Sequence, residues 1–192
     1  MRPPADPRTR RRAVAAPVGD DVPMERPHAK VITVSDSVST GERVDRAGPA
    51  LVERLEVGGF RVDDHRVVAD GTEQVADALA RAASGFHGVV VTTGGTGFGP
   101  RDLTPEGTAL VLEREAPGLA EAMRAVNPLG RLSRGRAGTV GRSLVLNLPG
   151  SPGGAVECLE AVLDVLPHAV ALLGGAGSTH PTTGRQGRSD GG

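Results

Sequence analysis

Residues 89–105 read Val-Val-Val-Thr-Thr-Gly-Gly-Thr-Gly-Phe-Gly-Pro-Arg-Asp-Leu-Thr-Pro, a buried-strand signal that runs into a glycine-rich turn and then into a helix start. The three valines favour extended backbone. Gly94, Gly95 and Gly97 permit backbone conformations that other residues avoid, so their amide N–H groups can turn toward a bound oxyanion. Thr104 is placed to cap a helix whose first turn holds a proline. An ordinary strand-to-helix turn accounts for one or two of the four glycines in this stretch but not for all of them, so the pattern favours a phosphate cradle.

Length and composition predict one globular domain with tails. The chain has 192 residues, of which 38% are hydrophobic, and a core of about 140 to 150 residues can bury roughly two thirds of its unfolded surface. The formal net charge is −1, and no apolar run approaches the ~20 residues of a membrane helix. We therefore expect neither a nucleic-acid partner nor a membrane partner. Lys30 is the single lysine, and the sequence holds no P-loop motif.

The two ends differ in composition from the middle. Residues 1–28 are rich in arginine and proline without an apolar period, which predicts a disordered arm. Residues 174–192, rich in glycine, serine and threonine, predict a flexible tail. The folded domain is then expected over residues 29–173. The apolar segment near the start is too short and too proline-broken for a secretory signal, so we expect a cytoplasmic protein.

Strand and helix patterns alternate between the tails. Strands are expected at 31–34, 60–68, 89–91 and 143–148, and helices at 48–57, 74–83, 105–115, 118–126 and 152–166. The last helix should bury Cys158 as a small apolar residue rather than expose it as a nucleophile. The alternation predicts a single three-layer α/β domain, with a mainly parallel sheet and helices on both faces. Ligands of such sheets bind at the carboxyl ends of the strands, which here lead into loops 35–41, 69–72, 92–104 and 148–154.

The loop at 148–154 repeats the design of the glycine-rich turn. It leaves a strand and offers Ser151 as an N-cap, with Pro152 at the first helical position. Taken alone, it is equally well explained as an ordinary capped helix. Two such helix starts on one sheet favour a ligand with phosphates that spans both loops.

Two aspartates fall at the same predicted edge. Asp70 follows the second strand and Asp102 lies in the glycine-rich loop. Phosphoryl or nucleotidyl transfer needs a divalent cation, and Mg²⁺ takes one or two carboxylates while it keeps several waters. Each aspartate also has an ordinary explanation, because Asp70 with Glu73 fits a capping box and Asp102 can pair with Arg101 in a turn. Spacing alone leaves both alternatives open.

Several motifs in order resemble the MoaB/Mog family of molybdenum-cofactor biosynthesis proteins. They are 31–41 with 45–49, 92–97 through 101–106, 114–119, 132–134 and 146–152, and the resemblance spans about Lys30 to Leu173. It implies a single molybdopterin-binding α/β domain that forms a homotrimer or a hexamer. For the adenylyltransferase members it also implies that ATP and Mg²⁺ are used to attach AMP to the terminal phosphate of molybdopterin, with release of pyrophosphate.

The resemblance also implies site residues. Asp70 and Asp102 would be the catalytic and metal-binding residues. The substrate-binding residues would be Ser35, Asp36, Thr93, Gly94, Gly95, Thr96, Gly97, Arg101, Ser133, Arg134, Pro149, Gly150, Ser151 and Pro152. Of these, Arg101 and Arg134 are candidates for phosphate oxygens, since a guanidinium fork binds them in bidentate fashion. Ser37 stands where many members have an arginine.

Two other functions fit parts of this pattern. A pterin-binding carrier or scaffold would use the same loops to deliver molybdopterin to a partner, such as another protein of the pathway, without chemistry. A generic nucleotide-binding module would not need the ordered segments 132–134 and 148–152. The presence of both aspartates favours the active enzyme.

Overall fold

The structure is a computed structural model that describes residues 26–175. Its elements are β1 (His28–Val34), α1 (Asp36–Ser39), α2 (Ala47–Val57), β2 (Arg61–Val68), α3 (Thr72–Ala83), β3 (Gly88–Thr93), α4 (Thr104–Ala109), β4 (Arg114–Glu115), α5 (Pro117–Ala125), the 3₁₀ helix η1 (Pro128–Leu132), β5 (Ala137–Val140), β6 (Ser143–Leu148), α6 (Pro152–Glu160) and α7 (Leu166–Leu173). Most of the predicted arm and tail lies outside the described residues.

One six-stranded sheet runs in the order β2-β1-β3-β6-β5-β4. Strands β2, β1, β3 and β6 are parallel, whereas β5 is antiparallel to β6 and β4 is antiparallel to β5. The sheet is therefore mixed and mainly parallel, which confirms the predicted α/β class. Alternating side chains of the strands bury two cores, one on each face.

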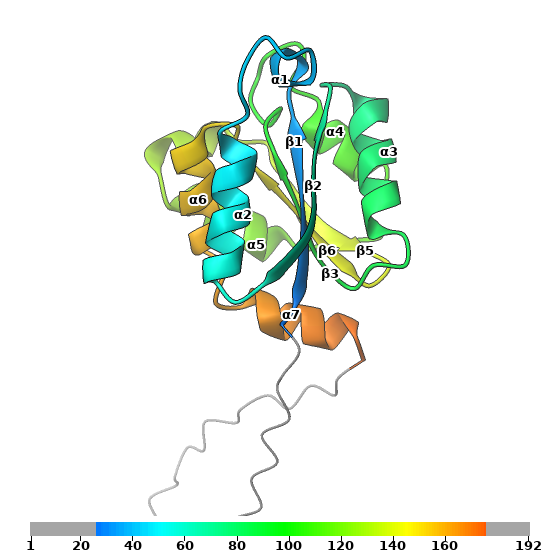
Figure 1. Cartoon of the computed structure of the whole chain (residues 1–192). Helices are drawn as coiled ribbons and strands as arrows, with labels where there is room; N and C mark the ends of the chain where they lie inside the picture. Colours follow the sequence, from blue (N-terminus) through cyan, green and yellow to red (C-terminus); the bar gives the residue numbers. More distant parts are fainter. Residues whose placement is uncertain (1–25, 176–192) are drawn as a thin grey trace, which may run out of the picture.

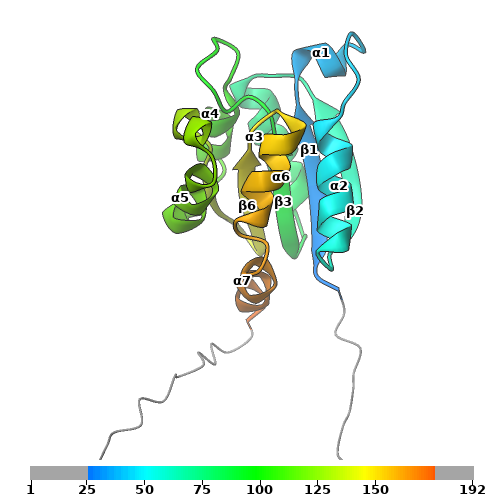
Figure 2. The ribbon, with the colours of Figure 1, turned by 90° about the vertical axis from the view of Figure 1, so that its left-hand side faces the viewer.

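Helices cover both faces of the sheet (Figure 1 and Figure 2). On one face the larger core joins Val31, Val89 and Leu146 to buried residues of α2, α5, α6 and α7. On the other face Ile32, Val90 and Val145 pack against the buried side of α3, and α3 lies beside α4. This is the predicted three-layer arrangement. The continuous valine run of β3 has no exposed residue because both of its faces are covered.

Two predicted helices are shorter than their apolar patterns. The helix expected at 105–115 ends at Ala109, and residues 114–115 instead pair with β5 as strand β4. The helix expected at 152–166 ends at Glu160, and α7 begins at Leu166. Val162 and Leu163 in the turn between them stay buried, so the apolar stripe continues although the helix does not. The elements α1, η1, β4, β5 and α7 were not predicted.

The fold includes residues that precede the predicted start of the domain. The guanidinium group of Arg26 donates to the backbone carbonyls of Glu56, Gly59 and Phe60, and β1 already begins at His28. Residues 26–28 of the predicted arm are therefore part of the fold. At the other end, Gly174 of the predicted tail is the C-cap of α7.

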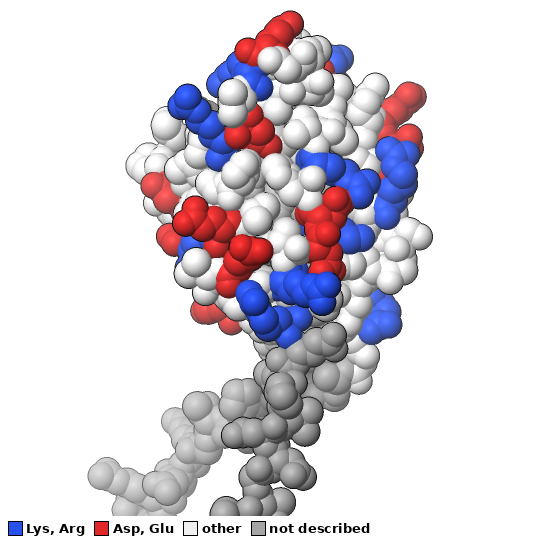
Figure 3. Space-filling view, in the orientation of Figure 1, with Lys and Arg blue, Asp and Glu red and all other residues white. Residues whose placement is uncertain are grey.

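The edge strand β2 carries charges of both signs. Arg61 pairs with Asp63, and Arg66 pairs with Asp64. Figure 3 shows Lys, Arg, Asp and Glu interspersed over this face. Charged side chains on an edge strand discourage pairing with a further chain. Within residues 26–175, no helix is long and apolar enough to cross a membrane.

Candidate active site

The loops after β1, β2, β3 and β6 meet at one edge of the sheet, because the carboxyl ends of parallel strands point the same way. In Figure 1 this edge lies at the top, around α1, and the start of β1 and helix α7 lie at the opposite end. The predicted loops therefore come together as expected.

The glycine-rich turn is built on two glycines with positive φ, Gly94 at +107° and Gly95 at +61°. A Cβ on Gly94 would lie 2.2 Å from the carbonyl oxygen of Val34, so this position also requires the absence of a side chain. The N–H of Gly94 donates to the carbonyl of Leu148 at 3.1 Å, so it cannot turn toward an anion as predicted. The N–H groups of Gly95, Thr96 and Gly97 donate to no residue within 26–175 and remain available for one.

Thr104 closes the turn instead of capping the next helix. It is the first residue of α4, and the cap position is taken by Leu103 without a side-chain bond. The Thr104 hydroxyl donates to the carbonyl of Gly94 at 2.9 Å, and its N–H donates to the carbonyl of Gly95 at 3.0 Å. Thr104 therefore fixes the shape of the turn from its far end.

The loop before α6 packs directly on this turn. Ser151 is the N-cap of α6 and Pro152 its first residue, as predicted, but the Ser151 side chain makes no capping bond. The hydroxyl of Thr93 donates to the carbonyl of Pro149 at 2.7 Å. A Cβ on Gly150 would lie 3.2 Å from the Cα of Gly94. The two predicted cradles are thus one continuous surface.

Two cavities flank that surface. The first, of about 480 Å³, lies between the glycine-rich turn and helices α5, η1 and α6. The second, of about 700 Å³, lies between the loops after β1, β2 and β3. Gly95, Asp102 and Gly150 line both cavities. Ligands held in the two cavities would therefore meet at Asp102.

The predicted binding residues divide between the cavities. Thr96, Gly97, Ser133, Pro149 and Ser151 line only the first. Ser35, Thr93, Gly94 and Pro152 line only the second, together with the catalytic candidate Asp70. Asp36, Arg101 and Arg134 line neither.

Asp70 forms hydrogen bonds with Asp36 and does not cap helix α3, which follows it. The N-cap of α3 is Gly71, with no side-chain cap, which rules out the capping box with Glu73. The Asp36 N–H donates to Oδ2 of Asp70 at 2.8 Å, and the Asp70 N–H donates to Oδ1 of Asp36 at 3.0 Å. The pKa of the Asp70 carboxyl is raised, chiefly because burial disfavours its charged form. The hydrogen bond from the Asp36 N–H lowers this pKa, whereas the nearby carboxylates of Asp36 and Asp102 raise it further.

Asp102 is held by the loop that carries it. Its Oδ2 accepts the N–H of Gly99 at 2.8 Å. Arg101 pairs with Asp36 instead, so the alternative explanation of Asp102 as a turn partner of Arg101 is wrong. Oδ1 of Asp102 and Oδ1 of Asp70 accept no hydrogen bond from any residue within 26–175. Each carboxylate thus has one oxygen without a donor among the described residues, and both aspartates line the second cavity.

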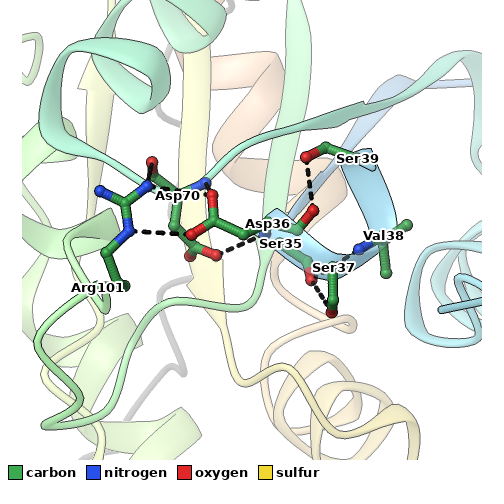
Figure 4. A network of polar contacts seen from close by, with 7 residues as sticks. All are labelled: Ser35, Asp36, Ser37, Val38, Ser39, Asp70 and Arg101. Carbon is green, nitrogen blue, oxygen red and sulfur yellow. Dashed lines mark hydrogen bonds and ion pairs between the residues drawn. The ribbon is translucent and has the colours of Figure 1, made fainter. Parts of the chain in front are cut away.

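Figure 4 shows how Arg101 joins the loops after β1 and β2. Its Nε donates to Oδ2 of Asp36 at 2.9 Å and its Nη2 to Oδ1 at 3.1 Å. The same Nη2 donates to the carbonyl oxygen of Asp70 at 2.7 Å. The pair lowers the pKa of the Asp36 carboxyl below its ordinary value, chiefly through the hydrogen bond from Arg101. Ser35, the N-cap of α1, has its hydroxyl 3.3 Å from that of Ser37.

The side chain of Arg134 forms hydrogen bonds with the backbone of the glycine-rich loop. Its Nε donates to the carbonyl of Gly97 at 2.7 Å, and its other nitrogens bind the carbonyl of Asp102 and the carboxylate of Glu106. The Arg134 N–H also donates to the carbonyl of Thr96 at 2.9 Å. These contacts engage all three guanidinium nitrogens of Arg134 with the glycine-rich loop and with Glu106.

Sequence reasoning missed Asn147, on β6. Its amide donates to the hydroxyls of Thr92 and Thr108 at 3.0 Å each, and its Oδ1 accepts the N–H of Arg136 at 3.0 Å. Asn147 is buried and lines the first cavity. An asparagine within an apolar strand pattern was the available signal, since a buried amide needs several partners.

Polar residues before α2 were also missed. Arg43, Asp45 and Arg46 line the second cavity, and neither arginine forms an ion pair with a residue in the described range. Asp45 accepts the hydroxyl of Thr33 at 2.6 Å and lies 3.1 Å from Nε2 of His65. The second cavity therefore carries two cations near the glycine-rich turn.

The burial of Cys158 at the wall of the first cavity can be tested chemically. Its Sγ donates to the carbonyl of Met123 at 3.3 Å. Burial raises the pKa of its thiol. Because the thiolate is the reactive form, we expect a disulfide reagent to modify the native protein at least about 100-fold more slowly than the urea-unfolded chain. Equal rates in the two states would contradict this placement.

The fold and site define a class of α/β protein with a glycine-rich strand-to-helix turn that lies between two cavities at the carboxyl edge of its sheet. Residues 30–168 match the family described as "Probable molybdopterin binding domain". The molybdopterin adenylyltransferase of Helicobacter pylori strain J99 is 37% identical over 157 residues, which cover 78% of this chain and 89% of that protein.

Solved structures of molybdopterin biosynthesis proteins are also similar to this chain. The molybdopterin biosynthesis enzyme MoaB of Thermus thermophilus is 48% identical with a TM-score of 0.74, covering 78% of this chain and 97% of that one. The molybdopterin biosynthesis Mog protein of Mycobacterium ulcerans is 39% identical with a TM-score of 0.71, covering 79% and 99%. The chain belongs to the MoaB/MogA family of molybdopterin-binding proteins of molybdenum cofactor biosynthesis.

Proposed function

We propose that this chain is a molybdopterin adenylyltransferase. The observation that carries the proposal is the shared rim of the two cavities, at Gly95, Asp102 and Gly150. A reaction between two substrates needs two binding sites that meet at the reacting atoms. The similarity to the Helicobacter pylori adenylyltransferase supports the same activity.

The proposed reaction joins two phosphates. An oxygen of the terminal phosphate of molybdopterin attacks the α-phosphorus of ATP, the new P–O bond forms, and the bond between the α-phosphorus and the bridging oxygen of the β-phosphate breaks. The electron pair leaves with pyrophosphate. The nucleophile is already an anion, so no serine and histidine pair is required, and positioning with charge neutralisation supplies most of the rate.

The linings suggest which substrate each cavity takes. The first combines apolar residues such as Met123 and Leu132 with polar groups of Ser133 and Asn147, which suits a pterin ring with hydrogen-bonding edges. The second offers Arg43 and Arg46 to the phosphates of ATP. The unoccupied N–H groups of the glycine-rich turn then face the phosphates where the two ligands meet.

The free oxygens of Asp70 and Asp102 fit a magnesium ion shared with ATP. Mg²⁺ usually takes one or two carboxylates and completes its shell with water and phosphate oxygens, and two are present here at one cavity. When bound, it would offset the negative charge that gathers on the phosphates. Within residues 26–175 no group of three or more His, Cys, Asp or Glu side chains could hold a metal ion.

A carrier that binds molybdopterin without chemistry is the second candidate, because the first cavity would serve it equally. The measurement that separates the two is pyrophosphate release. We expect release only when molybdopterin and Mg-ATP are both present under anaerobic conditions, and none from either alone. Molybdopterin binding without pyrophosphate would support the carrier, and release of orthophosphate instead would indicate simple ATP hydrolysis.

The family resemblance further supports a cytoplasmic homotrimer or hexamer. Large apolar side chains such as Leu110 and Leu129 are about 70% exposed in the single chain, and contacts between copies would cover such residues. Equilibrium sedimentation tests this directly. A mass of one chain, 19.6 kDa, at micromolar concentration would contradict it.

A further inference from the structure

Arg101 is the strongest candidate for a role that the family resemblance does not describe. The resemblance suggests a phosphate ligand, but Arg101 lines neither cavity. Two of its three guanidinium nitrogens are already engaged, Nε with Asp36 and Nη2 with Asp36 and the Asp70 carbonyl. In Figure 4 the guanidinium group of Arg101 faces Asp36 and the backbone of Asp70.

Three loops are joined at this point. Asp36 and Asp70 each accept the backbone N–H of the other, which ties the loop after β1 to the loop after β2. Arg101, from the glycine-rich loop after β3, then binds the Asp36 carboxylate with a two-bond fork. Its third bond reaches the Asp70 backbone. The orientation of Asp70 thus depends on all three loops.

Oδ2 of Asp70 is used by this network and Oδ1 is not. Oδ2 accepts the N–H of Asp36, whereas Oδ1 lies over Gly95, 3.0 Å from where a Cβ there would stand. Fixing one carboxylate oxygen fixes the direction of the other. The network therefore aims Oδ1 of Asp70 at the glycine-rich turn, where the two cavities meet.

Folding stability does not explain the network. The side chain of Arg101 is 60% exposed and that of Asp36 is 45% exposed. An ion pair this exposed is screened by solvent and contributes little to folding. A role in positioning accounts for its bidentate geometry and for the third bond to the Asp70 carbonyl.

We propose that Arg101 is a positioning residue of the transfer reaction, which acts through Asp36 to hold the Asp70 loop and does not bind a substrate phosphate. The inference rests on the proposed adenylyltransferase function. The variant Arg101→Ala should lower kcat about 10- to 100-fold, because small misplacements of a catalytic group have effects of that size. KM for ATP and for molybdopterin should each stay within about twofold, since only orientation is lost.

The test combines kinetics with amide exchange in the free protein. In Arg101→Ala, exchange of the Asp36 and Asp70 N–H groups should become at least about tenfold faster. Arg101→Lys should recover only part of kcat, because an ammonium group does not reproduce the two-bond fork. Asp36→Asn combined with Arg101→Ala should lose little more than Arg101→Ala alone, since residues of one network are not additive.

The control is Arg81→Ala, which removes a surface arginine that pairs with Asp77 on α3 and should change neither kcat nor the two exchange rates. A tenfold rise in either KM with unchanged amide exchange would overturn the inference and make Arg101 a phosphate ligand. Unchanged kcat with unchanged exchange would also overturn it. Absence of pyrophosphate release from the wild-type protein would instead refute the proposed function, and amide exchange would still show whether Arg101 holds the loop.

Discussion

Replacing Asp102 by asparagine is expected to lower turnover at least about 100-fold while the protein stays folded, an effect of the size seen when one electrostatic group is removed from an active site. Asp102 borders both cavities and its Oδ1 accepts no hydrogen bond from the described residues, so its charge lies where the two proposed substrate sites meet. Asparagine retains an oxygen for the N–H of Gly99, so the loop should keep its shape. Initial rates of pyrophosphate release measure the turnover, and a thermal melt shows whether the variant stays folded.

Asp70→Asn is expected to lose turnover to a similar degree. The Asp70 carboxylate is half-buried and near other carboxylates, so neutralising it should leave the melting temperature unchanged or raise it. Asp77→Asn is the matched control, since Asp77 is on α3 and lines neither cavity. Near-normal turnover in either variant would refute the role of that aspartate. Full pterin affinity with normal cofactor delivery in Asp102→Asn would favour the carrier.

The second large effect is expected from Gly94→Ala. The φ of Gly94 is +107°, and a Cβ there would lie 2.2 Å from the carbonyl oxygen of Val34. Both the backbone strain and the collision with buried backbone oppose folding, so the free energy of unfolding should fall by about 3 kcal/mol or more. For a domain of this size, that lowers the melting temperature by about 6 to 12 °C. Urea unfolding followed by circular dichroism measures the change.

Substitutions at two other glycines separate the effect of backbone strain from that of the collision. Gly59 has φ +89° but open space around its Cβ position, so Gly59→Ala should cost only the strain, about 1 to 2 kcal/mol. Gly118 lies in α5 with open space and no positive φ, so Gly118→Ala should stabilise the protein by about 0.5 to 1 kcal/mol. If Gly94→Ala cost no more than Gly59→Ala, the glycine-rich turn would not be packed against β1 as described.

Much of the parallel sheet could be predicted because its signals are local. The valines of β3 and the apolar run of β6 are continuous enough to identify buried strands, and the spacing of Leu51 and Leu55 identifies α2. Strands β4 and β5 could not be predicted, since a two-residue strand and a four-residue strand are defined by their pairing with distant chain. Val162 and Leu163 pack like helix residues although they lie in a turn, so periodicity alone does not show where α6 ends.

The site was predicted at the level of loops but not of contacts. Glycines and aspartates at strand ends are visible in the sequence, and the structure brings Asp70 and Asp102 to one cavity. The partner of Arg101 was not visible, because Asp36 is 65 residues away and no spacing rule relates them. The same holds for Asn147, which binds Thr92 on the neighbouring strand β3 and Thr108 on helix α4. Local chemistry suggested Arg134 as a phosphate ligand, and only the fold shows its bonds to the loop.

The most direct test of the proposed activity is to incubate the protein with molybdopterin and Mg-ATP under anaerobic conditions. The mass of the pterin product is measured by mass spectrometry, and the released pyrophosphate is quantified in the same reaction. We expect a product heavier than molybdopterin by one adenylyl group, formed in equal amount with pyrophosphate and absent from Asp102→Asn. Unmodified molybdopterin recovered bound to the wild-type protein, with no pyrophosphate, would contradict the proposed activity.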